Sequence, residues 1–320
     1  MTQVRLGVLG CAGIATRRML PAFAAAPSAH VVAVASRDHD KAEQVARQFG
    51  CEPVTGYEKL LSRHDIDAVY IPLPAALHAS WTERAIGCGK HVLCEKPLTT
   101  SAFQTERLVR MADEKGLVLR ENFMFPHHSQ HEQVRRLIDS GVIGKVCAFA
   151  AVFAIPPLSK DDIRYQAELG GGALFDVGVY PLRVAQYFHG PDLAVRGASL
   201  RYDHGVDVGG EVLLCSRDGV TVQATFGMEG VYRSSYDFWG SAGHLRLGRA
   251  YTPAADHQPH VQLWLRDEER EIVLQRDDQY TNAAESFARA VLTNAHGEGD
   301  SQITALADLV DRVRAAAARA

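Results

Sequence analysis

The feature that most constrains this chain is a glycine turn that joins a strand-like run to a helical pattern near the N-terminus. Val4–Leu9 is a largely apolar run, and Ile14–Ala26 places apolar residues at helical spacing. The turn between them is a degenerate form of G-x-G-x-x-G/A, in which Ala12 takes the place of the second glycine. Backbone amides at such a helix N-terminus face the phosphates of a dinucleotide. The sequence therefore predicts a nucleotide contact along Gly10, Cys11, Ala12, Gly13, Ile14 and Ala15.

The pattern of the first 120 residues continues this alternation of strands and helices. Further strands are expected at His30–Ala35, Ala68–Pro72, His91–Cys94 and Leu117–Arg120, and helices at Asp40–Phe49, His78–Cys88 and Thr100–Lys115. This order predicts a parallel sheet with helices on both faces. Ligands then bind at the carboxyl ends of the strands.

The regular alternation of strands and helices ends at about residue 121. Helices at His131–Ser140 and Ala173–Phe188 frame a strand at Lys145–Ile155, and several strand-like runs follow with alternating apolar and polar residues, as in Val220–Phe226. Two helices close the chain. We predict an α/β chain with an N-terminal Rossmann domain at residues 1–121. Residues 122–320 then form an α+β domain with a large, open, mostly antiparallel sheet for substrate binding and oligomerisation.

Composition excludes several classes of function. The 320 residues are 47% hydrophobic with a net charge of -4, which gives no basic surface for nucleic acid. The apolar runs are too short to cross a bilayer, and no leader-like segment precedes the first strand. The six cysteines form no C-x-x-C pair, as expected for buried thiols in a cytoplasmic protein.

No metal site is expected. His127 and His131 have the i,i+4 spacing of a helical ligand pair, but the spacing supplies no third ligand. We interpret the pair as structural or adjacent to the substrate.

The end of the second strand discriminates between dinucleotides. An NAD enzyme usually has an acidic residue there for the ribose, whereas this chain has Ser36 and Arg37, which suit a 2′-phosphate. Asp38 lies too late for the ribose role. The sequence favours NADP(H), and the alternative is an ordinary solvated loop.

Two further segments have catalytic potential. Glu95-Lys96-Pro97 ends the fourth strand, where the Lys96 cation can stabilise the negative charge of a reacting carbonyl oxygen. After Gly170–Gly172, Asp176 and Tyr180 lie four residues apart on a predicted helix, and a phenol can donate a proton to an alkoxide. Taken singly, a solvated lysine and a buried tyrosine are the ordinary alternatives.

With these segments the chain resembles the Gfo/Idh/MocA oxidoreductase family. The resemblance rests on Gly10–Ala15, Glu95-Lys96-Pro97 and Gly170–Tyr180. Tyr180 occupies a position that is often histidine in the family. Together with Glu121–Phe125 and Asp162–Tyr165, it makes the chain similar to the sugar 3-ketoreductases of deoxysugar biosynthesis.

This resemblance implies an activity and a site. Such enzymes use NADPH to reduce the C3 carbonyl of dTDP-3,4-diketo-2,6-dideoxyglucose to the 4-keto sugar, which goes into antibiotics. Lys96 and Tyr180 would be the catalytic pair, facing each other with the nicotinamide between them. Tyr236 and Thr252 would contact the nucleotide sugar. The cofactor would be contacted by the glycine turn and by Ser36, Arg37, Tyr57, Leu73, His78, Glu95, Arg164 and Asp176.

Other functions stay open. Trans-dihydrodiol, xylose and inositol dehydrogenases share much of this pattern, and a non-catalytic protein that senses NADP(H) is an alternative of another class. Retention of both Lys96 and Tyr180 favours an enzyme. Because exposed apolar sheet faces usually mark interfaces, we expect a homodimer or homotetramer.

Overall fold

The computed structural model describes residues 3–203, 205–297 and 299–318. The chain divides into two compact units, residues 1–123 with 280–304 and residues 124–279 with 305–320. A single boundary at residue 121 therefore does not describe the division, because residues 280–304 rejoin the first unit. Two contacts tie them there: the Glu285 carboxylate accepts hydrogen bonds from Ser28, and Arg120 donates to the carbonyl of Ala295 at 2.9 Å.

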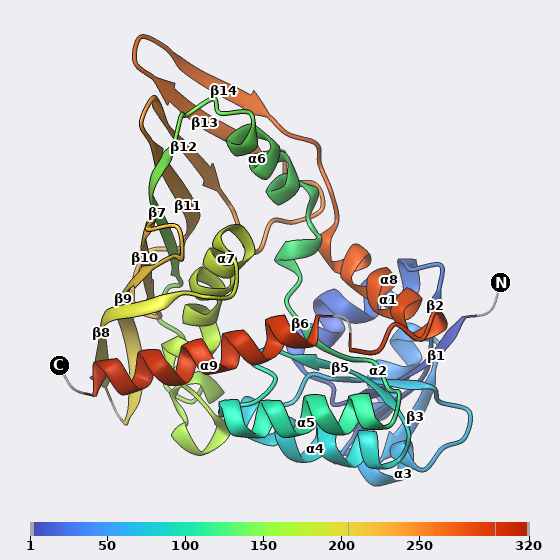
Figure 1. The fold of residues 1–320 in the computed structure, drawn as a ribbon. Helices are drawn as coiled ribbons and strands as arrows, with labels where there is room; N and C mark the ends of the chain where they lie inside the picture. Colours follow the sequence, from blue (N-terminus) through green and yellow to red (C-terminus); the bar gives the residue numbers. More distant parts are fainter. Residues whose placement is uncertain (1–2, 204, 298, 319–320) are drawn as a thin grey trace. The chain divides into compact units, whose positions relative to one another are not determined.

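The first unit contains a six-stranded parallel sheet with the order β3-β2-β1-β4-β5-β6. Figure 1 labels all of these strands except β4. The order reverses between β1 and β4, which is the point where α/β sheets bind ligands. The predicted Rossmann domain is confirmed. The strands are β1 (Val4–Leu9), β2 (Ala29–Ser36), β3 (Glu52–Thr55), β4 (Ala68–Ile71), β5 (His91–Glu95) and β6 (Leu119–Asn122).

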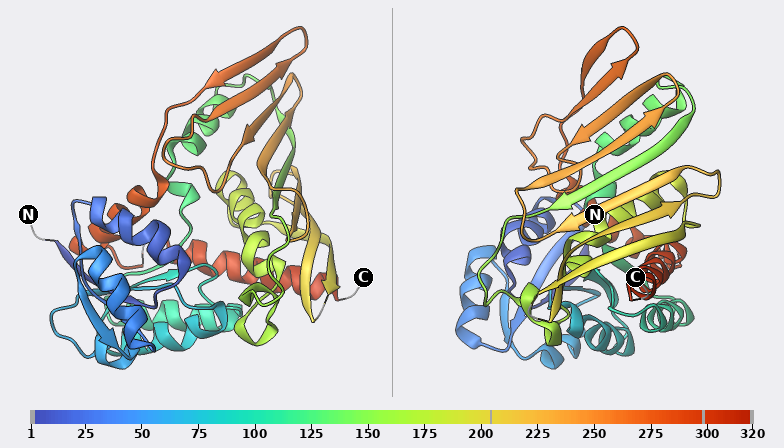
Figure 2. Two further views of the ribbon diagram at one scale, coloured as in Figure 1. Left: turned by 180° about the vertical axis from the view of Figure 1, so that it is seen from behind. Right: turned by 90° about the vertical axis from the view of Figure 1, so that its left-hand side faces the viewer.

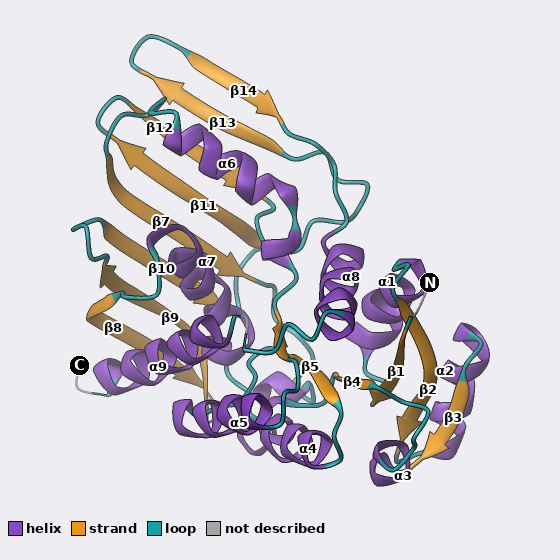
Figure 3. Cartoon of the chain, turned by 45° about the vertical axis from the view of Figure 1, so that its right-hand side comes forward, coloured by secondary structure: helices purple, strands orange, loops and turns teal. Residues whose placement is uncertain are grey.

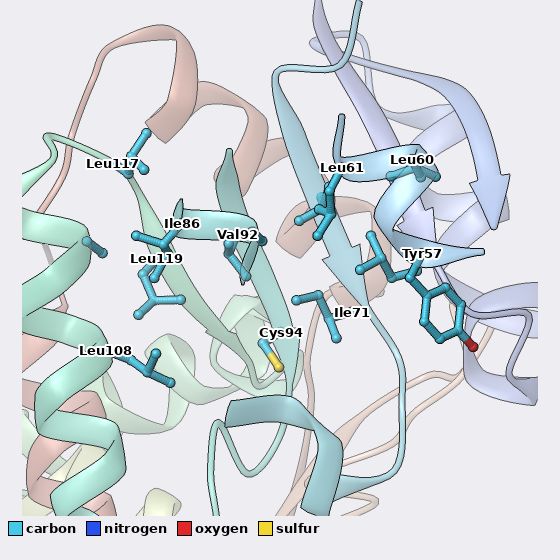
Figure 4. Packing of buried hydrophobic residues seen from close by; sticks show 14 of the residues in the cluster. Tyr57, Leu60, Leu61, Ile71, Ile86, Val92, Cys94, Leu108, Leu117 and Leu119 are labelled. Atoms are coloured by element: carbon cyan, nitrogen blue, oxygen red, sulfur yellow. The ribbon is translucent and has the colours of Figure 1, made fainter. Parts of the chain in front are cut away.

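Helices cover both faces of this sheet. On one face, Leu60, Ile86 and Leu108 pack onto a core of buried strand residues (Figure 4). On the other face, the ring of Phe23 meets that of Tyr70, with centroids 5.6 Å apart. The helical segments are the π-helix η1 (Ala15–Met19), α1 (Leu20–Ala25), α2 (His39–Phe49), α3 (Tyr57–Leu61), α4 (Ala75–Gly87), α5 (Ala102–Glu114) and α8 (Gln279–Leu292).

The second unit contains an eight-stranded sheet with the order β14-β13-β12-β11-β7-β10-β9-β8 (Figure 3). All neighbouring strands are antiparallel except β7 and β10, so the predicted mostly antiparallel sheet is confirmed. The strands are β7 (Val146–Ala154), β8 (Ala194–Asp203), β9 (Val206–Cys215), β10 (Thr221–Gly227), β11 (Arg233–Gly240), β12 (Gly243–Gly248), β13 (His260–Leu265) and β14 (Glu269–Val273).

One face of this sheet packs on helix α7 (Figure 2). Aromatic rings alternate inward along the strands, and Phe149 of β7 and Phe238 of β11 both contact Phe188 of α7. The helical segments are η2 (Phe125–His127), α6 (Ser129–Asp139), η3 (Ile163–Tyr165), η4 (Ala167–Leu169), the π-helix η5 (Leu174–Gly178) and α7 (Val179–His189); α9 (Asp300–Ala317) runs from the first unit into the second.

None of the helices in the described residues has both the length and the hydropathy of a membrane span. The same residues contain no group of three or more histidine, cysteine, aspartate or glutamate side chains placed to hold a metal ion.

Candidate functional site

The glycine turn after β1 depends on a residue without a side chain. Gly10 has a φ of 122°, and a Cβ there would lie 3.0 Å from Cδ2 of Leu73. Gly10 and Leu73 thus lie against each other at the carboxyl end of the sheet. Cys11 is buried, and burial raises the pKa of its thiol, so the side chain stays neutral. The turn then leads into a helix whose first turns are wound as a π-helix.

The residues after β2 suit an anionic group. Ser36 ends the strand, and its hydroxyl accepts a hydrogen bond from the Asp38 amide at 3.1 Å. Asp38 is the N-cap of α2 and accepts from the Lys41 amide at 3.2 Å, so its carboxylate is engaged by the helix. Arg37 is exposed and lies beside Tyr57, whose pKa is raised by burial and lowered to a smaller extent by Arg37. Among the described residues that follow β2, the Asp38 carboxylate is engaged in the helix cap, and Ser36 and Arg37 suit a 2′-phosphate.

His78 connects the loop after β4 with the turn after β5. Its side chain is buried, with Nδ1 at 2.7 Å from the carbonyl of Pro97 and Nε2 at 2.6 Å from the carbonyl of Leu73. Burial lowers the pKa of the imidazole. Because both ring nitrogens face backbone carbonyls, His78 fixes the position of Leu73 relative to the turn that contains Lys96.

The turn at Lys96 is held from both sides by glutamates. Oε1 of Glu95 accepts hydrogen bonds from the Tyr70 hydroxyl at 2.6 Å and from Nδ2 of Asn122 at 2.7 Å. Burial raises the pKa of Glu95, while Tyr70, Asn122 and Lys96 lower it to a smaller extent. Beyond the turn, Oε1 of Glu121 accepts from the Leu98 amide at 2.8 Å. Lys96 itself is half-buried, and these hydrogen bonds of Glu95 and Leu98 anchor the backbone on either side of it.

Sequence reasoning missed the roles of Tyr70 and Asn122. Both follow from the strand register, which pairs Tyr70 with Leu93 and Asn122 with Glu95 in neighbouring parallel strands. Side chains two residues apart on a strand share a face, so Tyr70, Glu95 and Asn122 meet on one side of the sheet. A polar residue at or next to the end of each of three neighbouring strands is a signal that could have found them.

In the second unit, the helix with Asp176 and Tyr180 begins at a buried carboxylate. Gly172 has a φ of 120°, and a Cβ there would lie 2.3 Å from Oδ1 of Asp207. Oδ2 of Asp207 accepts a hydrogen bond from the Leu174 amide at 2.6 Å, which satisfies the helix N-terminus. Burial raises the pKa of Asp207. Asp207 comes from β9, and no local sequence signal connects it with the glycines.

Asp176 and Arg164 form an ion pair at the start of this helix. Nε of Arg164 donates to Oδ2 of Asp176 at 2.6 Å, and Nη1 donates to Asp162 at 3.1 Å. Burial lowers the pKa of Arg164, but the two carboxylates raise it further, and the net pKa lies above its ordinary value. The structure thus brings together Arg164 and Asp176, which were both predicted to shape the cofactor pocket.

Tyr180 lies in an aromatic cluster. Its side chain is only 4% exposed, and its ring contacts Phe153 with centroids 5.0 Å apart, Tyr251 at 5.6 Å and Phe125 at 6.1 Å. The Tyr251 hydroxyl is fully buried, finds no hydrogen-bond partner among the described residues, and has a pKa well above the ordinary value because of burial. Tyr251 was not predicted from the sequence, because an aromatic residue in a loop has no distinctive pattern.

Tyr236 and Thr252 lie in different surroundings. Tyr236 is fully buried, and its hydroxyl lies 3.0 Å from Nδ1 of His131. Burial lowers the pKa of His131 to about 3, so this imidazole is neutral. Thr252 is half-buried, and its hydroxyl lies 2.8 Å from that of Tyr232. Thr252 is thus at the rim of the unit, whereas Tyr236 and His131 belong to the core.

Comparison with known proteins decides the family. Residues 4–123 match the model of an oxidoreductase family with an NAD-binding Rossmann fold, Gfo/Idh/MocA, and residues 131–246 match the C-terminal domain of the same family. The chain belongs to the Gfo/Idh/MocA oxidoreductase family. The resemblance seen in the sequence is confirmed, and it extends over both units.

Several relatives share an activity. The dTDP-3,4-didehydro-2,6-dideoxy-alpha-D-glucose 3-reductase of Actinomadura kijaniata is 52% identical over 98% of this chain and 96% of its own. That of Streptomyces violaceoruber is also 52% identical, over 98% of this chain and 95% of its own. The crystal structure of a 3-ketoreductase from Actinomadura kijaniata with NADP and TDP-benzene has a TM-score of 0.96, at 52% identity and 98% coverage of both chains.

Proposed function

We propose that this chain uses NADPH to reduce the C3 carbonyl of dTDP-3,4-diketo-2,6-dideoxyglucose, giving the dTDP-4-keto sugar. The observation that carries the proposal is the similarity along the full chain to reductases of this substrate. Solved variants of the Actinomadura kijaniata 3-ketoreductase replace one lysine and one tyrosine. Those two residues are separated by the same number of positions as Lys96 and Tyr180.

In the proposed reaction, Lys96 and Tyr180 both act on the oxygen of the C3 carbonyl. NADPH, when bound, supplies the hydride that goes to C3. The Lys96 ammonium stabilises the negative charge that develops on the oxygen, and the Tyr180 hydroxyl donates the proton that converts the alkoxide to an alcohol. The anchored backbone around Lys96 supports its role, because a cation stabilises a transition state best when its position is fixed beforehand.

The residues after β2 support the choice of NADPH over NADH. Arg37 is exposed and can pair with the 2′-phosphate, and the Ser36 hydroxyl can donate to it. The carboxylate of Asp38 caps α2 instead of facing a ribose.

A substrate panel tests the proposal. The loss of NADPH absorbance is followed with the dTDP-diketo sugar, and NADP+ reduction is followed with D-xylose, myo-inositol and a trans-dihydrodiol. We expect efficient turnover only with the dTDP sugar. Faster turnover of D-xylose or the dihydrodiol would replace the proposal with a dehydrogenase function. NADPH binding without turnover of any of these substrates would favour the sensing protein.

We also infer that the chain forms a homodimer or homotetramer through the sheet face of the second unit that points away from α7. Leu213 and Trp239 follow inward-facing residues on their strands and are 43% and 56% exposed. Light scattering of the wild type and of Trp239→Arg tests this inference, because the variant should be a smaller assembly. A monomeric wild type would refute it.

The six cysteines are free, which fits a cytoplasmic protein, and cell fractionation checks that location. The expectation of buried thiols is wrong for Cys88 and Cys147, which are exposed.

A further inference from the structure

An arginine with a left-handed backbone follows β12. Arg249 has a φ of 49°, a conformation that glycine adopts without cost and that other residues adopt rarely. Its side chain is exposed, although the next two residues, Ala250 and Tyr251, are buried. Strained backbone of this kind is often found at ligand sites. Arginine at this position, in place of glycine, therefore indicates a role for its side chain.

The guanidinium of Arg249 is held by an aromatic ring. It lies over Tyr232, 5.1 Å from the ring centroid, and the Tyr232 hydroxyl is 2.8 Å from that of Thr252. No carboxylate of the described residues forms an ion pair with Arg249. The guanidinium donors are thus oriented by the ring and are available to an anionic ligand.

The same ring connects Arg249 with the proposed catalytic tyrosine. Tyr232 contacts Phe153, with centroids 6.3 Å apart, and Phe153 contacts Tyr180 at 5.0 Å. Tyr251, two residues after Arg249, contacts both Phe153 and Tyr180. Arg249 therefore lies at the rim of the aromatic cluster around Tyr180, inside one unit.

We propose that Arg249 binds the diphosphate of the nucleotide-sugar substrate. This inference rests on the proposed function. A nucleotide sugar carries its diphosphate beside the sugar ring, so a sugar that reacts at Tyr180 places two negative charges near the rim of the cluster. A planar guanidinium matches phosphate oxygens in pairs. Of the hydroxyls of Tyr232 and Thr252, one donates to the other, and the second is a further donor at the same place. Arg249 then selects sugars linked to a nucleoside diphosphate over free sugars.

Calorimetric titrations of the NADP+-bound enzyme test the proposal, with dTDP and thymidine as probes. The variants are Arg249→Gln and Arg249→Gly, and Arg217→Gln is the control that removes an equal charge from an exposed turn of the same unit. We expect the Kd for dTDP to rise at least tenfold in both Arg249 variants and to stay within twofold of the wild type in the control. The Kd for thymidine, which has no phosphate, should not change.

The glycine variant separates ligand binding from a structural role. Because glycine adopts a positive φ easily, Arg249→Gly should have a Tm equal to or above that of the wild type while it binds dTDP weakly. Unchanged dTDP affinity in both Arg249 variants would overturn the inference and leave the proposed function intact. A wild type that does not bind dTDP would overturn both the inference and the proposed substrate.

Discussion

The hydroxyl of Tyr70 lies 2.6 Å from Oε1 of Glu95, and this bond fixes the end of the strand that leads into Lys96. The same oxygen accepts from Asn122, so three neighbouring strands meet at one buried carboxyl group. A buried carboxylate is tolerated only when it is hydrogen-bonded. The end of β5 therefore depends on donors that lie outside the Glu-Lys-Pro motif.

Replacing Tyr70 by phenylalanine tests this dependence. Tyr70→Phe removes one donor from the buried Glu95, and we expect a loss of about 1–3 kcal/mol in the free energy of unfolding. The kcat should also fall, because the backbone of Lys96 is held less firmly. Urea unfolding and steady-state kinetics measure both effects. Tyr202→Phe, at a tyrosine that is 65% exposed, is the control and should change neither.

Removal of the Lys96 amine should affect the chemical step. Lys96→Ala is expected to lower kcat by about two to three orders of magnitude, because the charge on the carbonyl oxygen loses its counter-ion. The Kd for NADPH, measured by fluorescence titration, should stay close to that of the wild type. Lys115→Ala, at an exposed lysine, is the control. Unchanged turnover in Lys96→Ala would remove this residue from the mechanism.

A charge reversal at Arg37 should change the cofactor preference. Arg37→Asp removes a partner of the 2′-phosphate and introduces an acid that can bind a ribose, so the ratio of kcat/KM for NADPH to that for NADH should fall at least tenfold. Steady-state kinetics with both cofactors measure the ratio. Arg110→Asp makes the same change of charge on the exposed surface of α5. Equal ratios in Arg37→Asp and the wild type would contradict the assignment.

Adding a methyl group at Gly172 should disturb the helix that carries Tyr180. In Gly172→Ala the new Cβ would lie 2.3 Å from Oδ1 of Asp207, at a φ of 120°. We expect a loss of about 2–4 kcal/mol in the free energy of unfolding and a lower kcat. Gly248→Ala is the control, because a Cβ there meets nothing within 4 Å. Equal stability losses in the two variants would contradict the cap by Asp207.

His131 should make stability depend on pH. Burial lowers its pKa from 6.5 to about 3, so below pH 6.5 the unfolded chain binds a proton that the folded protein does not. The stability from this group is complete above pH 6.5 and is lost as the pH falls towards 3, by about 1.4 kcal/mol per pH unit.

The variant His131→Asn isolates this effect. It should be less stable than the wild type at pH 7.5, because it leaves a cavity beside Tyr236, but it should lose less stability between pH 7.5 and 5.0. Urea unfolding at both values measures the difference. His189, whose pKa is lowered to about 4, titrates in both proteins and cancels in the comparison. Equal losses of unfolding free energy between pH 7.5 and 5.0 in the two proteins would show that His131 is not the group responsible.

Some elements were predictable because their signals are local. The alternation of apolar strands and helices, with the glycine turn after Val4–Leu9, predicted the parallel sheet that the structure contains. The edge strand Glu52–Thr55 was missed, because it is short, mostly exposed and contains a proline, as edge strands often do. The motif around Lys96 and the Gly170–Tyr180 segment identified the family by short-range pattern alone.

The sequence by itself determined the class of each unit, the family and the candidate residues, because hydrophobic periodicity and glycine turns act over a few residues. Only the tertiary structure decided which side chains support those candidates: Tyr70 and Asn122 at Glu95, Asp207 at Gly172, and Tyr251 at Tyr180. These partners come from other strands and loops of the same unit. They meet through strand pairing and core packing. Such contacts between distant segments produce no periodic pattern in the sequence.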